Sequence, residues 1–332
     1  MKRFFWLLFT LILSVPVQAQ IITFAHGDNQ LQGHYLAATD NLPTKAVLLF
    51  VHGDGEMPYD AKGFYELIWH PLREQGYAIF SWDKAGVGGS SGKWLNQSMK
   101  DRQEEVAAAI EAIQSRYPFS AHNTGLLGFS QAGWVVPALA NASTNIGFAV
   151  GIGFATNWVQ QGEYLTLTRM MQANASPSEI KQAIHAHREQ IAFFDRSPSY
   201  QEYLQQAGNN PMSENRFQFV LKNYQADASQ DFNNIQLPVL LLWGDSDLNV
   251  DASHELNLWQ HRPNPNNHVE TRMIANATHE MLRADLFNES GYGIGMWLKM
   301  MFLEEDALAP DFLPTLIKWL NVQTQPPSIN KL

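Results

Sequence analysis

The residues best suited to chemistry lie around Ser130, in the run GFSQAG at residues 128–133. This run follows an apolar segment typical of a β-strand, residues 124–129 (TGLLGF), and precedes a predicted helix over residues 131–140. A serine at such a strand-to-helix turn is held with its hydroxyl exposed, and small neighbours let the strand and helix pack closely. The helix N-terminus also directs free N–H groups toward a developing oxyanion. A serine that only caps a helix is the alternative, and the flanking elements favour a nucleophile.

A parallel β-sheet is the element predicted to position Ser130. Continuous apolar runs such as residues 46–51 (AVLLFV) are typical of strands that are buried on both faces. Strand and helix patterns alternate along the chain, which indicates parallel strands joined by right-handed crossovers. The predicted strands are residues 21–25, 30–37, 46–51, 77–82, 124–129, 148–154, 238–243 and 269–274, and the predicted helices are residues 61–75, 96–116, 131–140, 253–259 and 312–322.

The alternation is interrupted once, over residues 156–234. This segment has a helical period and no strand pattern, and some eighty residues are too many for a plain loop. We predict a helical cap over the sheet edge where ligands of open α/β sheets bind. Met170 or Met171 could line an acyl pocket there, because methionine adapts to varied apolar shapes. The apolar positions of helical spacing are Trp158, Tyr164, Leu165, Met170, Met171, Phe193 and Phe194.

The turn at Ser130, together with this order of elements, resembles the α/β-hydrolase superfamily. Similar enzymes carry an oxyanion loop after an earlier strand, and here that loop is His52-Gly53-Asp54-Gly55. The resemblance implies that the backbone N–H groups of Asp54 and Gln131 bind the oxyanion. We interpret His52 as a brace for this loop rather than as a catalytic group.

The same resemblance assigns the acid and the base. The acid of similar enzymes is the aspartate of Gly-x-x-Asp after a late strand, which is Asp247 here, with Asp245 as the alternative. Asp251 is interpreted as the cap of the following helix. The base follows the last strand, where His279 lies. In this arrangement His279 takes the Ser130 proton, Asp247 fixes the imidazole tautomer, and an acyl-enzyme forms and is hydrolysed.

The resemblance covers nearly all of the chain after its first residues and implies an α/β-hydrolase fold. We expect a mostly parallel central sheet flanked by helices, with core residues 20–155 and 235–332 and with the cap, residues 156–234, inserted before the penultimate strand. The chain looks similar to secreted bacterial esterases and dipeptidyl-peptidase-like acyl hydrolases. Hydrolysis of an ester-type bond is the expected activity. An aminopeptidase or amidase, a thioesterase, and a catalytically inactive binding protein of the same fold stay open as alternatives.

Composition and local motifs exclude several other classes of protein. The net charge is −10 without a cluster of cations, so a nucleic-acid partner is not expected. The absence of cysteine excludes disulfides and thiolate metal sites. His185, His187 and Glu189 do not match a zinc motif, and residues 83–90 (DKAGVGGS) match a glycine-rich loop of many family members rather than a phosphate loop. We therefore expect no metal or cofactor and a small acyl compound as substrate.

The N-terminus has the layout of a secretory signal peptide. Lys2 and Arg3 precede an apolar stretch over residues 4–15, and Val17-Gln18-Ala19 predicts cleavage after Ala19. The mature protein is then expected in the periplasm or outside the cell, without stable membrane insertion. An uncleaved anchor is the alternative, although the stretch is shorter than the ~20 residues of a membrane span. Oligomeric state cannot be predicted from the sequence.

Overall fold

The computed structural model describes residues 19–39, 42–232, 235–262, 268–287 and 293–325. The first eighteen residues of the predicted signal peptide lie outside the described residues. No helix in the described part of the chain combines the length and hydropathy needed to cross a membrane.

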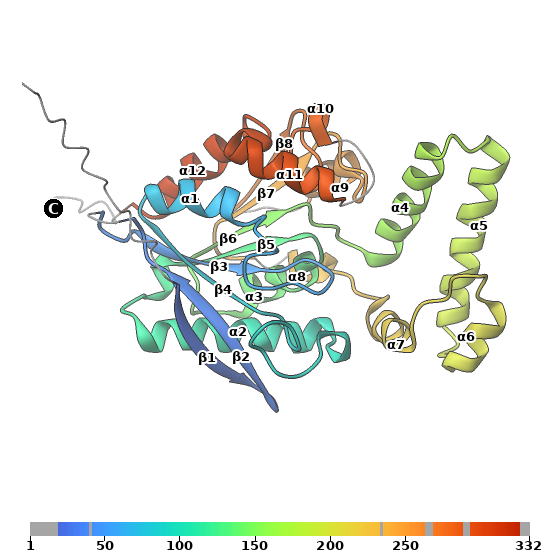
Figure 1. The fold of residues 1–332 in the computed structure, drawn as a ribbon, viewed down its shortest axis with the longest axis horizontal. Coiled ribbons are helices and arrows are strands. Elements are labelled where there is room, and N and C mark those ends of the chain that lie inside the picture. Colours follow the sequence, from blue (N-terminus) through green and yellow to red (C-terminus); the bar gives the residue numbers. More distant parts are fainter. Residues whose placement is uncertain (1–18, 40–41, 233–234, 263–267, 288–292, 326–332) are drawn as a thin grey trace, which may run out of the picture.

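An eight-stranded sheet forms the centre, in the order β1-β2-β4-β3-β5-β6-β7-β8 (Figure 1). β2 pairs antiparallel with β1 and β4, and the pairings from β4 to β8 are all parallel. Every residue of β3, β4, β5, β6 and β7 is buried, as their continuous apolar sequences predict. The strands are β1 (Gln20–His26), β2 (Asn29–Leu36), β3 (Ala46–Val51), β4 (Tyr77–Trp82), β5 (Thr124–Phe129), β6 (Phe148–Ile152), β7 (Val239–Gly244) and β8 (Val269–Ile274).

Helices cover both faces of the sheet. One apolar core lies between the sheet and α1 (Glu66–Glu74), α10 (Ala284–Phe287) and α12 (Phe312–Gln323). The core on the opposite face includes buried residues of four further helices, α2 (Met99–Arg116), α3 (Val136–Ala142), α8 (Ser229–Phe232) and α9 (Ala252–Gln260). Short 3₁₀ turns connect these elements: η1 (Trp94–Asn96), η2 (Ala121–Asn123), η3 (Ser130–Trp134) and η4 (Glu304–Ala307).

Three predicted helices differ from the observed ones, and the smallest difference is at residues 96–116, where the helix begins only at Met99, after the Ser98 cap. The helix predicted over residues 61–75 begins only at Glu66, since Ala61 and Lys62 have φ values of 51° and 60°, which a right-handed helix excludes. The helix predicted over residues 131–140 is divided into η3 and α3. Val135 separates them, with φ −121° and ψ −57°.

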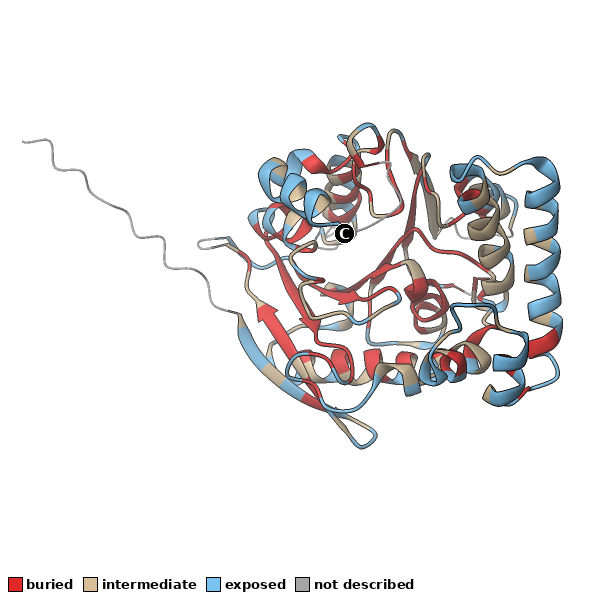
Figure 2. Cartoon of the chain, turned by 45° about the vertical axis from the view of Figure 1, so that its right-hand side comes forward, coloured by how far each residue is buried: buried red, intermediate tan, exposed pale blue. Residues whose placement is uncertain are grey.

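Residues 156–232 hold α8 and four longer helices between β6 and β7. These four, which we call the inserted helices, are α4 (Trp158–Gln172), α5 (Pro177–Phe194), α6 (Tyr200–Gln206) and α7 (Glu214–Asn223). Each begins after a serine or asparagine whose side chain accepts a backbone N–H, a local signal for a helix start. They lie at one end of the sheet and are more exposed than its strands (Figures 1 and 2). Their own small core contains Phe193, Phe194, Tyr203, Phe217 and Tyr224.

α11 (Ile294–Leu303) has no counterpart among the predicted elements. Its sequence, IGMWLKMMFL, is the most apolar of the longer helices, yet each of its residues is at least partly exposed. Ile294 is 81% exposed and Phe302 is 88% exposed. The helix packs across the outside of the core formed by α1, α10 and α12, through Met296, Met300 and Leu303.

Candidate active site

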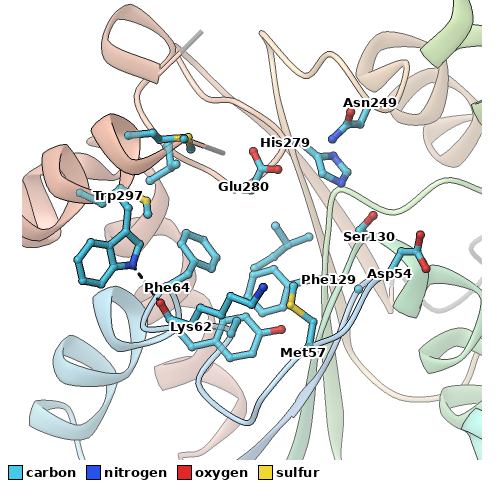
Figure 3. A pocket seen from close by; sticks show the side chains of 18 of the residues that line it. Asp54, Met57, Lys62, Phe64, Phe129, Ser130, Asn249, His279, Glu280 and Trp297 are labelled. Carbon is cyan, nitrogen blue, oxygen red and sulfur yellow. Dashed lines mark hydrogen bonds between the residues drawn. The ribbon is translucent and has the colours of Figure 1, made fainter. Parts of the chain in front are cut away.

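Ser130 occupies the turn between β5 and η3. Its φ is 50°, a left-handed conformation that is unusual for a residue with a side chain. The turn is tight because a Cβ at Gly128 would lie only 2.9 Å from the Cβ of Ala132 and from Val136. The GFSQA sequence thus meets a steric requirement, with glycine where the strand approaches the following turn. The Ser130 side chain projects into a cavity beneath His279 (Figure 3).

The structure joins His279 to Asp247 rather than to Asp245. The His279 Nδ1 atom lies 2.7 Å from Asp247 Oδ2. Asp247 Oδ1 accepts the backbone N–H groups of Asn249 and Val250 at 2.7 and 2.8 Å, so both carboxylate oxygens are engaged. Asp245 is exposed, and its Oδ1 accepts the Ser246 hydroxyl. Asp251 caps α9 by accepting the backbone N–H of His254, as predicted for it.

The protonation of His279 is controlled by opposing effects. Burial lowers the pKa of its imidazole, while the charge and hydrogen bond of Asp247 raise it, and a smaller contribution comes from Glu280. The balance raises the pKa of His279 to about 9. A nearby carboxylate stabilises the imidazolium that forms when a histidine accepts a proton.

Two buried basic side chains hold the backbone of the loop at residues 52–55, which we call the oxyanion loop. Lys84 donates to the carbonyl oxygens of Gly53 and Gly55 at 2.8 and 3.0 Å. Arg102 donates to the His52 carbonyl at 2.5 Å. Burial, reinforced by Arg102, holds the pKa of Lys84 well below its usual value. With these carbonyls bound by the two buried basic side chains, the loop is fixed against Ser130, and a Cβ at Gly53 would lie 3.3 Å from Ser130 Cβ.

The side chains of the two predicted oxyanion residues belong to the same network. Gln131 accepts a hydrogen bond from Arg102 at 2.7 Å and donates one to Asp54 at 3.1 Å. Asp54 also forms a bidentate ion pair with Arg216 of α7, at 2.9 and 2.6 Å. An inserted helix is therefore tied to the oxyanion loop.

His52 has the geometry of a brace, consistent with its interpretation from the sequence. It is 1% exposed, and its Nε2 atom lies 2.6 Å from the Trp82 carbonyl oxygen. Its Nδ1 atom lies 3.2 Å from the Tyr65 hydroxyl. Burial lowers the pKa of His52 to about 3, which keeps the ring neutral: Nε2 donates to the carbonyl and Nδ1 accepts from the hydroxyl.

The loop that carries Asp247 is held from the inserted helices. Three side chains of α4 donate to three consecutive backbone carbonyls of residues 247–249, which we call the acid loop. Tyr164 donates to Asp247 at 3.0 Å, Thr168 to Leu248 at 2.8 Å and Gln161 to Asn249 at 3.1 Å. The sequence predicts Tyr164 only as an apolar packing position, and these hydrogen bonds have no signal in it.

Two cavities of unequal size adjoin Ser130. The larger, about 600 Å³, extends from Ser130 and His279 to α11, with Trp297 on its far side (Figure 3). The smaller, about 250 Å³, lies between Ser130 and the inserted helices. Leu165 and Trp158 line the smaller cavity. Among the described residues that line the two cavities, neither Met170 nor Met171 is present, and Met171 is 59% exposed. The apolar wall of the larger cavity opposite Ser130 comes from Met296, Trp297 and Met300 of α11, and the two predicted methionines line neither cavity.

The remaining motifs have structural roles. His185 pairs with Glu189 at 3.4 Å on an exposed face of α5, and His187 contacts the Val159 carbonyl oxygen at 3.3 Å. In the part of the chain that the structure describes, no three histidine or acidic side chains are grouped as metal ligands. In the glycine-rich loop, Asp83 accepts the backbone N–H groups of Tyr59 and Gly89, which folds this loop against the site.

Comparison with known proteins establishes the family. The serine aminopeptidase (S33) family model matches residues 43–285, which is most of the chain. The chain belongs to this family of α/β-hydrolases. It is therefore a hydrolase with the α/β-hydrolase fold, as the resemblance of the Ser130 turn implied. No curated protein matches the chain.

Solved structures share the fold of this S33-family protein at low sequence identity. An esterase of Pyrococcus furiosus is 14% identical, with a TM-score of 0.58 over 93% of this chain and 92% of the other. A proline iminopeptidase of Mycobacterium smegmatis is 14% identical, with a TM-score of 0.57 over 92% and 99% of the two chains. The esterase domain of a Rhodothermus marinus protein is 17% identical, with a TM-score of 0.53 over 93% and 100%.

Proposed function

We propose that this protein hydrolyses carboxylic esters, with Ser130 as nucleophile, His279 as base and Asp247 as acid. The observation that carries the proposal is the 2.7 Å contact between His279 and the buried carboxylate of Asp247, beside a strained serine that lines the same cavity. With Nδ1 bonded to Asp247, the His279 Nε2 atom is the nitrogen that can accept the Ser130 proton.

The proposed reaction has two halves. Ser130 Oγ attacks the ester carbonyl as His279 takes its proton, and the backbone N–H groups of Asp54 and Gln131 stabilise the oxyanion. The carbon–oxygen bond to the alcohol breaks, and His279 returns the proton to the departing oxygen. Water then attacks the acyl-enzyme by the same route and releases the acid.

An ester is favoured as substrate by the apolar lining of the larger cavity, which suits an uncharged substrate. Aminopeptidase activity is the second candidate. Glu280 lines the same cavity, and a carboxylate there could pair with a substrate ammonium group. A panel of acyl esters, acyl thioesters and aminoacyl amides separates the candidates. If aminoacyl amides are the best substrates and Glu280→Gln removes that preference, the second candidate replaces the first.

The nucleophile is tested by Ser130→Ala. We expect a folded protein whose turnover falls by at least ~10³-fold and which no longer reacts with a fluorophosphonate. Ser246→Ala is the matched control. Ser246 directly precedes the acid loop, and the described hydrogen bond of its hydroxyl is to the Asp245 carboxylate. Labelling of the Ser130→Ala protein, or turnover at the parental rate, would overturn the assignment.

We also propose that the chain is exported and cleaved after Ala19. The proposal rests on the charged, apolar and small-residue layout of residues 1–19. Intact mass of protein from a secreting host should correspond to a chain that begins at Gln20. Recovery of only the full-length chain from the cytoplasm would contradict export.

A further inference from the structure

The two cavities at Ser130 bear on which ester this protein cleaves, and the inference rests on the function proposed above. We propose that the larger cavity binds the alcohol portion of the ester and the smaller cavity the acyl portion. The preferred substrates are then short-chain acyl esters of large apolar alcohols. α11 and not the inserted helices would select for the size of the alcohol.

The position of His279 assigns the alcohol to the larger cavity. When the tetrahedral intermediate collapses, the bond between the carbonyl carbon and the alcohol oxygen breaks, and the proton held on His279 passes to that oxygen. The alcohol must therefore depart on the side of His279. His279 lines the larger cavity, whereas the described lining of the smaller cavity does not include it.

The acyl group is left bonded to Ser130 Oγ on the other side. The smaller cavity contains Gln131, whose backbone N–H is a proposed oxyanion donor, and Trp134, which follows on the same turn. Trp134 stacks on Trp158 with ring centroids 4.7 Å apart, and its indole N–H donates to the Thr156 carbonyl oxygen at 3.1 Å. A wall fixed in this way cannot retreat from a long chain. The ion pair of Asp54 with Arg216 and the amide of Gln161 also line this cavity, so it suits a short acyl group better than a long alkyl chain.

The larger cavity is suited to an apolar group of some size. Its volume of about 600 Å³ is within the ~300–1,000 Å³ typical of ligand pockets. Its wall opposite Ser130 is formed by Met296, Trp297 and Met300 of α11, facing Phe64 and Phe129 of the core. Methionine side chains adapt to ligands of different shape, which suits a set of related alcohols. The indole N–H of Trp297 donates to the Lys62 carbonyl oxygen at 3.3 Å and anchors the helix over the cavity.

Isomeric esters test the assignment. Hexyl acetate and ethyl hexanoate have the same formula but place the long chain on opposite sides of the carbonyl. Each buried methylene contributes about fourfold to kcat/KM, from ~0.8 kcal/mol per methylene. We expect kcat/KM for hexyl acetate to exceed that for ethyl hexanoate by at least about tenfold.

Two neighbouring methionines of α11 provide a matched pair of variants. Met300 lines the cavity, whereas Met301 is 56% exposed and lies outside its described lining. Met300→Asp places a charge in the alcohol site and should reduce kcat/KM for hexyl acetate by at least about tenfold. Met301→Asp should leave kcat/KM for both esters unchanged. Leu165→Ala enlarges the smaller cavity and should raise kcat/KM for ethyl hexanoate.

A preference for ethyl hexanoate, equal rates for the two isomers, or equal effects of the two aspartate variants would overturn the assignment of the cavities. In each of these cases Ser130 would still react with a fluorophosphonate, and the proposed esterase activity would stand. A different result would contradict the proposed esterase activity: neither isomer is hydrolysed, and Ser130 is not labelled by the fluorophosphonate.

Discussion

The oxyanion loop lies against Ser130, the acid loop carries Asp247, and the backbones of the two loops are held in different ways. Lys84 and Arg102, both buried in the core, bind the carbonyl oxygens of the oxyanion loop. The acid loop is bound by neutral hydroxyl and amide groups of α4, which belongs to the inserted helices. The backbone of the oxyanion loop is thus held from the sheet domain, although the Asp54 side chain also pairs with Arg216 of the inserted helices, whereas the backbone of the acid loop is held from the inserted helices.

The difference indicates which loop the protein holds more rigidly. A hydrogen bond from a guanidinium group, such as that of Arg102, is stronger than one between neutral groups, and a buried carbonyl that loses its donor is costly. The oxyanion loop must present N–H groups in one orientation to stabilise a developing charge. The acid loop is also held by the hydrogen bonds from the backbone N–H groups of Asn249 and Val250 to the Asp247 carboxylate. The loop therefore depends less on its contacts with α4.

The largest expected effect comes from the acid itself. Asp247→Asn should lower kcat by about 10⁴-fold, because the amide favours the wrong His279 tautomer. Asp245→Asn is the control, since Asp245 is exposed and does not contact His279 among its described bonds. Steady-state kinetics of both variants measure this, and the reverse ranking would assign the acid to Asp245.

Removal of the Lys84 amine should have the next largest effect. Lys84→Met frees the Gly53 and Gly55 carbonyls, and we expect kcat to fall by roughly 10- to 100-fold, with little change in KM, because the oxyanion donors act mainly in the transition state. The rate of fluorophosphonate labelling should fall in parallel. Lys45→Met is the control, since Lys45 binds Asn321 on the exposed surface. A rise in KM at constant kcat would contradict a role in positioning the oxyanion loop.

A smaller effect is expected when α4 loses one contact to the acid loop. Thr168→Val removes the hydrogen bond to the Leu248 carbonyl, and a neutral hydrogen bond contributes about 1 kcal/mol, so kcat should fall by no more than about fivefold. Thr166→Val is a close control, because the Thr166 hydroxyl bonds to Gly162 within α4. If Thr168→Val lowers kcat as much as Lys84→Met does, the acid loop depends on its contacts as strongly as the oxyanion loop, and the proposed difference in rigidity is wrong.

The smallest expected effect is a shift of the pH profile. The base form of His279 is the active one, so kcat/KM should rise with pH and level off above the pKa of about 9. The Glu280 carboxylate helps to raise this pKa. Glu280→Gln should therefore move the rise to lower pH, while the plateau stays unchanged. A profile of Glu280→Gln that moves to higher pH, or does not move, would show that Glu280 has no electrostatic effect on the base.

Most of the sheet could be predicted from the sequence because five of its strands, β3 to β7, are buried on both faces. The predicted ranges 46–51, 77–82, 124–129 and 269–274 coincide with β3, β4, β5 and β8. Three of these are continuous apolar runs, and Gly, Pro or Asp residues lie close to their ends. The resemblance to α/β-hydrolases implied the pairing of His279 with Asp247, because both residues follow late strands as in similar enzymes, and the function of this pair stays a proposal.

Other features of the site have no local signal. Lys84 donates a hydrogen bond to the carbonyl oxygen of Gly53, which lies 31 positions earlier in the chain. A single lysine in a glycine-rich loop does not reveal this contact. α11 escaped prediction because it contains a glycine and has apolar residues on all sides, so it lacks the one-sided stripe of a helix packed on a core. The apolar run at residues 294–303 is the local signal that points to this helix.

The left-handed backbone at Ser130 has a bearing on how such a sequence evolves. A residue with a side chain is disfavoured at a φ of 50° by roughly 1 kcal/mol relative to glycine. Selection for stability alone would therefore replace Ser130 with glycine, and only selection for turnover retains the hydroxyl. A descendant that kept the fold as a binding protein would be expected to lose this serine early, and to become more stable as it did so.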